Sequence, residues 1–164
     1  MYLITQYGAD LMPAQTHYID SIYYDLELTA NVIKTMGAQI FEKMGIELTP
    51  VEHAALDTIS CNKGICQRDL AKLIFKDRAN TGRILDSLEE KKLIKRYIDT
   101  KNNRLVRKLD LTEKGRRKLN NIRNKIEETL KTISISISDD EISKIQNSLK
   151  SLRNAVLEIV NVKI

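Results

Sequence analysis

The chain has 164 residues, of which 42% are hydrophobic and 30% charged, a composition typical of one ordered core with extensions rather than of two large domains. Residues 63–118 contain eighteen Lys and Arg against eight Asp and Glu, a net charge of +10, whereas the remainder has a net charge of −5. No apolar run approaches the roughly 20 residues that span a bilayer and no signal peptide is evident, so we expect a cytoplasmic protein without a membrane partner.

The N-terminal segment, residues 1–48, carries apolar residues at heptad spacing. This spacing predicts one long amphipathic helix with a narrow apolar seam. The seam consists of Ile19, Ile22, Leu26, Thr29, Ile33, Met36 and Ile40.

A second segment, residues 49–112, begins with helix start signals. Thr49 is a capping residue, Pro50 suits the first helical position, and Glu52 is placed to close a capping box. After this helix and a turn at 61–64, residues 67–74 form a short helix whose Leu70, Leu73 and Ile74 face inward.

Asp77 caps a further helix, and residues 75–76 join the two short helices into a helix-turn-helix. After Leu93 the apolar pattern alternates, which predicts a strand over 94–99, a polar turn at 100–103 and a returning strand over 104–111. This basic hairpin is expected to act as a wing. The net charge of +10 around it is the footprint of a nucleic-acid-binding element.

The third segment, residues 113–164, repeats the helical stripes of the first. Thr112 caps one long helix and Ser138 caps another, with residues 133–138 as the connection. Each stripe could pack within its own chain, but three stripes at the chain ends favour a homodimer. The two C-terminal stripes are formed by Leu119, Ile122, Ile126 and Ile133, and by Ile142, Ile145, Leu149, Leu152, Val156 and Ile159.

The order of these elements resembles the MarR family of winged helix-turn-helix regulators over nearly the whole chain. The specific stretches are QRDLAKLI, RANTGRILDSLEEKKLIKR and the LTEKG that follows the hairpin. The resemblance implies a mainly α fold, with a winged helix-turn-helix domain flanked by long dimerisation helices. It also implies an obligate homodimer whose terminal helices intertwine, which binds a palindromic operator and usually represses, with release by a small ligand or by oxidation.

Three positions depart from the family pattern. The wing tip usually carries Asp-x-Arg, whereas this chain has Asn102, Asn103 and Arg104. Lys92 stands where the family usually has Gly before Leu. Gly82 replaces a commoner Thr in the recognition helix, which costs about 1 kcal/mol of helix propensity but allows close approach to DNA.

The second helix of a helix-turn-helix lies in the major groove, so its N-terminal residues are predicted to meet DNA. Asn80 and Arg83 suit adenine and guanine edges, and the alternative for each is a phosphate contact or plain exposure. The predicted contacts on this helix are Arg78, Asn80, Thr81 and Arg83.

The wing tip and the surrounding basic residues complete the predicted interface. Lys101, Asn103 and Arg104 should reach the adjacent minor groove or its phosphates, because a narrow groove attracts arginine. The residues that neutralise the phosphate backbone, or else form only a solvated basic face, are Gln67, Arg68, Lys95, Arg96 and Arg107.

Two kinds of regulatory residue are predicted: effector-binding residues from the family resemblance, and a redox-active cysteine from its position at a helix N-cap. Family effectors sit between the terminal helices and the winged domain, although packing at the dimer interface is the alternative for each polar or aromatic residue there. Cys66 occupies a helix N-cap beside Arg68, a setting that lowers the pKa of a thiol. The redox hypothesis is that oxidation of Cys66, in one form to a disulfide with Cys61, shifts the DNA-reading helices. Its alternative is a small residue without a redox role. The effector residues considered are His17, Tyr18, Tyr23, Tyr24 and His53.

Other classes of function find less support. There is no nucleophile motif, no phosphate-binding Gly loop and no paired carboxylates, so we expect no enzyme. Two cysteines and two histidines supply no zinc ligand set, so we expect no metal and no cofactor. A winged-helix protein-interaction module and a non-specific DNA-binding protein remain as alternatives.

Overall fold

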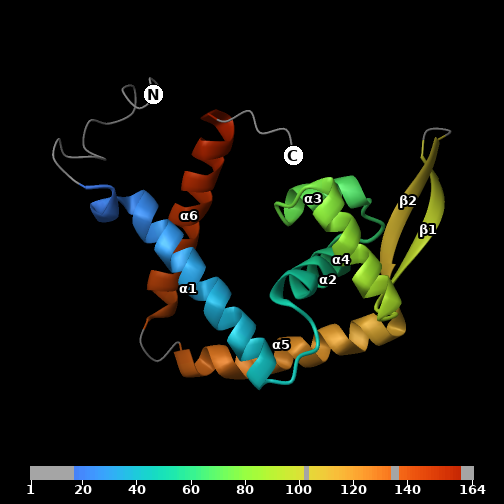
Figure 1. Ribbon diagram of the computed structural model, residues 1–164, viewed down its shortest axis with the longest axis horizontal. Helices are drawn as coiled ribbons and strands as arrows, with labels where there is room; N and C mark the ends of the chain where they lie inside the picture. Colours follow the sequence, from blue (N-terminus) through green and yellow to red (C-terminus); the bar gives the residue numbers. More distant parts are fainter. Residues whose placement is uncertain (1–16, 102–103, 134–136, 160–164) are drawn as a thin grey trace. The chain divides into compact units, whose positions relative to one another are not determined.

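The computed structural model describes residues 17–101, 104–133 and 137–159 and confirms a mainly helical chain with one two-stranded antiparallel sheet (Figure 1). The chain divides into two compact units, and the boundary between them in the sequence lies between Pro50 and Val51. The elements are a 3-10 turn η1 at Tyr18–Asp20, α1 at Ile22–Lys43, α2 at Pro50–Cys61, α3 at Gln67–Leu73, α4 at Arg78–Glu90, β1 at Ile94–Lys101, β2 at Arg104–Leu111, α5 at Glu113–Ile133 and α6 at Asp139–Ile159.

The first long helix begins three residues later than its stripe predicts. Ser21 has an extended backbone, and its hydroxyl accepts the N–H of Tyr24 at 3.3 Å, which caps α1. Ile19 therefore lies in the preceding turn η1, outside the helix. The heptad spacing gave the period of this segment correctly, but the capping chemistry of Ser21 sets its start.

The core of the second unit draws leucines and isoleucines from every element between α2 and α5. Leu56 of α2, Leu70 of α3, Leu85 of α4, Leu109 of β2 and Leu119 of α5 are all fully buried or nearly so. Because these side chains come from consecutive elements, the helix-turn-helix and the root of the hairpin share one hydrophobic core.

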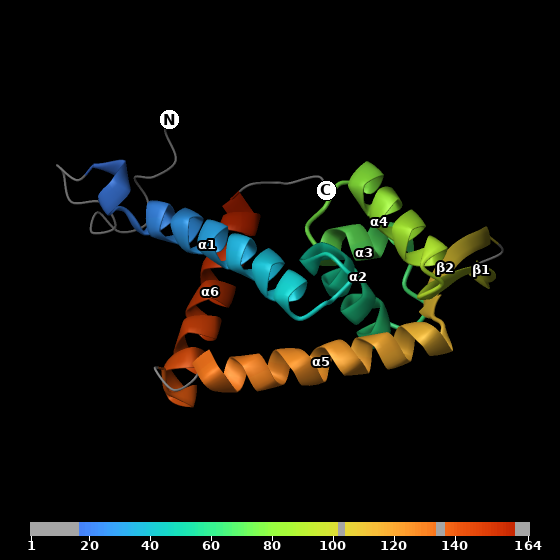
Figure 2. The same cartoon turned by 60° about the horizontal axis from the view of Figure 1, so that its bottom comes forward.

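Thr112 and Gly115 join the hairpin to α5. The Thr112 hydroxyl donates to the carbonyl oxygen of Lys92 at 2.7 Å and accepts the N–H of Gly115 at 3.0 Å. A Cβ on Gly115 would lie 2.0 Å from the carbonyl oxygen of Leu93. Only glycine therefore allows the first turn of α5 to lie this close to the backbone of Leu93, in the turn that follows α4. Figure 2 shows α5 continuing from this junction as one uninterrupted helix.

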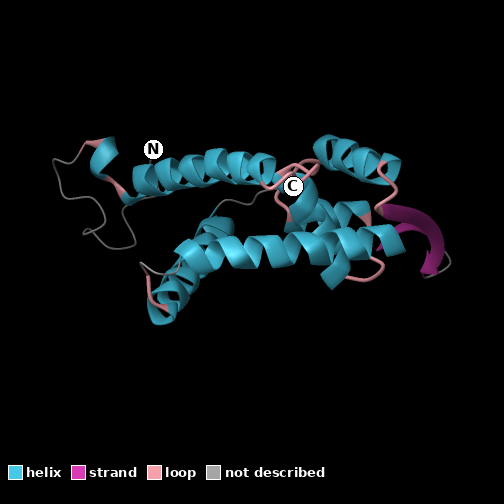
Figure 3. Ribbon diagram, turned by 90° about the horizontal axis from the view of Figure 1, so that it is seen from below, coloured by secondary structure: helices cyan, strands magenta, loops and turns pink. Residues whose placement is uncertain are grey.

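The wing is a twisted hairpin whose strands pair from Ile94–Leu111 at the root to Lys101–Arg104 at the tip (Figure 3). At its root, Leu109 N–H donates to the carbonyl of Ile65 at 2.9 Å. Cys66 and Lys108 form an isolated bridge beside it. The turn before α3 is thereby attached to the outer edge of β2, which fixes the wing to the helix-turn-helix.

The last helix is capped as predicted. Ser138 and Glu141 form a reciprocal capping box, in which the Ser138 N–H donates to Glu141 Oε2 at 2.9 Å. Residues 134–136 of the predicted connection lie outside the described residues. Among the residues of α6 that are described, none is buried. None of the described helices combines the length and apolar character that a membrane crossing needs.

Candidate nucleic-acid interface

The N-terminus of α4 is held by Asp77. Its carboxylate accepts the N–H of Asn80 at 2.8 Å, and this bond holds the pKa of Asp77 below its usual value. The Asn80 side-chain amide also donates to Asp77, and its oxygen accepts from Arg83 Nη1 at 3.4 Å. Hydrogen bonds thus link Asp77, Asn80 and Arg83 along the exposed face. If Asn80 contacted a base, its side chain would give up these hydrogen bonds for hydrogen bonds to the base.

One face of α4 is buried and the other is open. Arg78, Asn80 and Arg83 are exposed, as the prediction for a DNA-reading face requires. Thr81 is fully buried, and its hydroxyl donates to the carbonyl of Asp77 at 2.8 Å. The prediction that Thr81 touches DNA is therefore wrong, because its position on the helix points it into the core beside Leu85 and Leu88.

Behind α4 lies a buried carboxylate that the sequence did not single out for this role. Glu52 of α2 accepts from the Ser87 hydroxyl at 2.6 Å and from Lys91 Nζ at 2.6 Å. A buried charge is tolerated when paired and hydrogen-bonded, and removal of its partners is costly. Glu52, first interpreted as a capping-box residue, thus ties the C-terminal half of α4 to α2.

A second brace connects α4 to the wing. Arg96 of β1 pairs through Nη2 with Asp86 at 2.6 Å and through Nη1 with Glu89 at 3.0 Å, and its side chain is 26% exposed. Its charge is already matched by two carboxylates, so the phosphate contact predicted for Arg96 would have to exchange these partners and stays a prediction. In the absence of DNA, Arg96 links the wing to α4.

The predicted residues of α3 divide between positioning and exposure. Gln67 Nε2 donates to the carbonyl oxygen of Arg78 at 3.1 Å, which links the first turns of α3 and α4. Arg68 is largely exposed and pairs with Asp69 at 3.4 Å. An exposed pair of this kind contributes little to stability, which leaves Arg68 able to exchange its partner for a phosphate.

The wing tip lies partly outside the described residues. Lys101 and Arg104 end the two strands and face each other in the register, while Asn103 and both of these side chains are not described. Below the tip, Lys108 pairs with Asp99 at 2.5 Å, which lowers the pKa of Asp99 and raises that of Lys108. That lysine charge is compensated within the hairpin.

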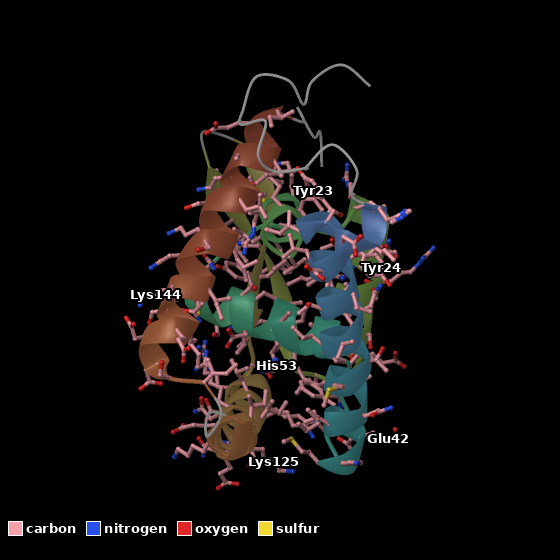
Figure 4. All side chains as sticks on the ribbon, turned by 90° about the vertical axis from the view of Figure 1, so that its left-hand side faces the viewer. Tyr23, Tyr24, Glu42, His53, Lys125 and Lys144 are labelled. Atoms are coloured by element: carbon pink, nitrogen blue, oxygen red, sulfur yellow. The ribbon has the colours of Figure 1, made fainter. Side chains whose placement is uncertain are left out.

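The predicted effector residues lie on two separate units. His17, Tyr18 and Tyr23 are exposed, and the Tyr18 hydroxyl donates to Glu27 at 3.0 Å, which raises the pKa of Tyr18. The Tyr18 and Tyr24 rings meet edge to face at 5.8 Å. Figure 4 labels Tyr23 and Tyr24 on α1 and His53 on α2.

His53 is the one predicted effector residue that lies on α2. Burial lowers its pKa below 6.5; Asp57 opposes this shift and Arg123 adds to it. Arg123 of α5 pairs with Asp57 at 2.6 Å, so α2 and α5 meet here through charge. A hollow of about 450 Å³ elsewhere in this unit includes none of the predicted effector residues. It is lined by Asn62, Lys63, Gly64, Ile65, Asp69, Lys72 and Leu73.

Both cysteines are free thiols. Cys66 occupies the N-cap position of α3, as predicted, with an extended backbone and no capping hydrogen bond from its side chain. Its thiol instead donates to Asp69 Oδ2 at 3.1 Å, which contributes most to the lowered pKa of Asp69. Cys61 is exposed at the end of α2.

Comparison with known proteins identifies the winged segment. The model of the MarR family matches residues 48–106, from the start of α2 into the wing. A crystal structure of the transcriptional regulator SlyA is 26% identical, with a TM-score of 0.69, over 84% of this chain and 94% of that protein.

Two DNA complexes share the fold. Staphylococcus aureus MepR bound to DNA is 21% identical with a TM-score of 0.69, over 85% of this chain and 99% of MepR. Streptococcus pneumoniae FabT bound to DNA is 20% identical with a TM-score of 0.62, over 84% of this chain and 96% of FabT. At this level of identity the likeness establishes the fold.

Proposed function

We propose that this chain, a member of the MarR family of DNA-binding transcriptional regulators, acts as a homodimer that represses transcription from a palindromic operator. The match to this family favours a regulator over an enzyme. The observation that carries the proposal is the open N-terminal half of α4, where Arg78, Asn80 and Arg83 are exposed on a helix braced from behind.

The contacts of Glu52 and Arg96 with α4 matter because a recognition helix must keep its position when DNA replaces the water at its surface. Glu52 holds the C-terminal half of α4 to α2, and Arg96 holds the same half to the wing. The N-terminal half is left to enter the major groove, where an arginine can take guanine and an asparagine adenine. Among the described residues, no ion pair engages Arg78 or Arg83, so both charges are available to DNA.

Homodimer formation is supported by apolar residues that are exposed in the described part of the chain. On α1, Ile33 and Met36 are exposed, and on α6, Ile145, Leu149 and Val156 are exposed. Contiguous exposed apolar stripes mark surfaces that bind a partner, and heptad spacing suits a helical one. A dimer would present two recognition helices to half-sites about 34–36 Å apart, one turn of the duplex.

Regulation by a small ligand or by oxidation is part of the same proposal. The ligand would contact the tyrosines and histidine of the N-terminal segment or His53 of α2, and oxidation would act at Cys66, which occupies the N-cap of the first helix of the helix-turn-helix. If Cys66→Ser loses DNA binding under peroxide as fully as the unaltered protein does, oxidation acts elsewhere.

The decisive test is selection of bound sequences from a random duplex pool at two salt concentrations. Recovery of a pseudo-palindrome is the expected result, with binding that weakens steeply as salt rises because counterions are released from the duplex. Arg83→Gln should weaken binding to the selected duplex. Arg117→Gln, a matched change of an exposed arginine on α5, should leave binding nearly unchanged.

Other outcomes assign other functions. Salt-sensitive binding without an enriched sequence would identify a non-specific DNA-binding protein. Absence of duplex binding at either salt would favour a protein-interaction module and would contradict the proposal.

A further inference from the structure

The wing has an apolar surface that the described residues leave exposed. Alternate residues of each strand share one face, and the face that holds Ile94, Leu109 and Leu111 is buried at the root of the hairpin. Further out on this same face, Ile98 is 64% exposed and Leu105 is 77% exposed. These two residues are diagonal neighbours, because Ile98 pairs with Arg107 and Leu105 with Thr100.

This face is turned toward the recognition helix. Arg96 lies on it, between Ile94 and Ile98, and reaches Asp86 and Glu89 of α4. Ile98 stands four residues beyond the buried Ile94, so it extends about 13 Å from the core at the rise of a strand. The apolar pair therefore projects past the core on the face that Arg96 joins to α4.

A cation accompanies the apolar pair. Arg107 is the cross-strand partner of Ile98, shares its face and is exposed. Within the described part of the chain, no ion pair involves Arg107, whereas Lys108 on the opposite face is matched by Asp99. The face toward α4 thus combines two uncovered aliphatic side chains with one uncompensated positive charge.

A strand of duplex DNA matches this combination, because its backbone alternates phosphates with deoxyribose rings that offer carbon surface. We propose that Ile98 and Leu105 pack against deoxyribose rings of the strand between the major groove read by α4 and the adjacent minor groove, while Arg107 pairs with a phosphate there. This inference rests on the proposed function. It assigns the wing a non-electrostatic share of DNA affinity, separate from the charges at its tip.

The two kinds of contact can be separated by salt dependence. The double variant Ile98→Thr/Leu105→Thr has a β-branched side chain, which suits a strand, at both positions. It should bind the selected duplex, or a mixed-sequence duplex of about 30 base pairs, roughly tenfold more weakly. Its plot of log affinity against log salt should keep the slope of the unaltered protein. Arg107→Gln should instead reduce that slope by about 1.8, which is about 0.9 for each of the two wings of the dimer. Val106→Thr, on the opposite face, is the matched control and should change neither quantity.

The outcomes distinguish this inference from the function on which it rests. If the unaltered protein binds the duplex and the double variant binds equally well, the inference is overturned and the proposed function stands. If the double variant keeps its affinity but changes its sedimentation coefficient, the patch contacts a second copy of this chain and not DNA. If the unaltered protein binds no duplex, both fail. Thermal unfolding of the double variant should match that of the unaltered protein, because both side chains are exposed.

Discussion

The winged segment and the terminal helices use the same kind of apolar side chain in opposite ways. Between α2 and α5, residues such as Leu56, Leu85 and Leu119 are fully or almost fully buried within one chain. On α1 the buried residue is Phe41, and on the described part of α6 there is none, although both helices carry apolar stripes. One region therefore completes its core alone, and the other leaves apolar surface available to a partner.

The difference shows that a hydropathy pattern predicts that a helix or strand forms, but predicts less well which residues pack against its apolar face. A stripe of period 3.6 predicts a helix wherever it occurs. Whether the stripe meets its own chain depends on contacts distant in sequence, and for α6 the described residues leave Ile145, Leu149 and Val156 exposed. Changes in the two regions should accordingly have different consequences, for folding in one and for association in the other.

The largest effect is expected at Gly115. In Gly115→Ala the new methyl group would lie 2.0 Å from the carbonyl oxygen of Leu93, and backbone cannot yield as a flexible side chain can. The free energy of unfolding should fall by about 3–4 kcal/mol, as measured by urea denaturation. Gly82→Ala is the matched control, since the nearest neighbouring atom is 3.4 Å away on the flexible Gln67 side chain.

The control should move in the opposite direction. Gly82 lies inside α4, so alanine there should raise the free energy of unfolding by about 0.5–1 kcal/mol through helix propensity. If Gly115→Ala unfolded at the same urea concentration as the unaltered protein, the close packing of α5 on the turn after α4 would not contribute to stability.

Association should be abolished by charges on the stripe of α6. Leu149→Glu/Val156→Glu places two like charges on the exposed apolar face, which would have to be desolvated on dimer formation. Sedimentation velocity should show a monomer, and affinity for a palindromic duplex should fall about a hundredfold as bivalent binding is lost. Asn147→Glu, on the opposite side of α6, should leave a dimer. A dimeric double variant would exclude the α6 stripe from the interface.

Much of the fold could be predicted because its signals are local. Asp77 caps α4, Ser138 and Glu141 form a capping box, and Cys66 occupies the N-cap of α3, each at the predicted position. Caps and turns depend on a few consecutive residues, so the sequence contains the information that determines them.

The site was predicted less completely because its geometry depends on tertiary partners. Thr81 looked like a DNA contact, but the rotation of α4 buries it; Arg96 looked like a phosphate contact, but Asp86 and Glu89 lie within its reach. Leu73, expected to face inward, is 60% exposed at the end of α3. No sequence signal identifies the pairing of Glu52 with α4, since its partners are 35 and 39 residues away.

Lys92 offers a smaller test, in the stabilising direction. It ends the turn after α4 with φ of 58°, the left-handed region that glycine adopts without strain. Lys92→Gly should therefore raise the free energy of unfolding by about 1 kcal/mol in urea denaturation. Lys91→Gly is its neighbouring control: Lys91 is helical and pairs with Glu52, so its loss should destabilise the domain. Equal effects at the two positions would contradict the argument from backbone strain.

The smallest expected effect is the contribution of His53 to the pH dependence of the free energy of unfolding. Burial lowers its pKa below 6.5, with Arg123 adding to the shift and Asp57 opposing it. The unfolded chain then binds a proton more readily than the folded one, so stability is complete above pH 6.5 and declines as pH falls toward the lowered pKa of the folded state. Urea denaturation between pH 7.5 and about 5 should show this decline, and His53→Gln should reduce it. Loss of stability from the lowered pKa values of Asp77 and Asp99 belongs to a more acidic range, so it should not obscure the comparison. If the free energy of unfolding of His53→Gln depended on pH as steeply as that of the unaltered protein, this imidazole would be solvated in the folded protein. The contact between α2 and α5 would then admit water.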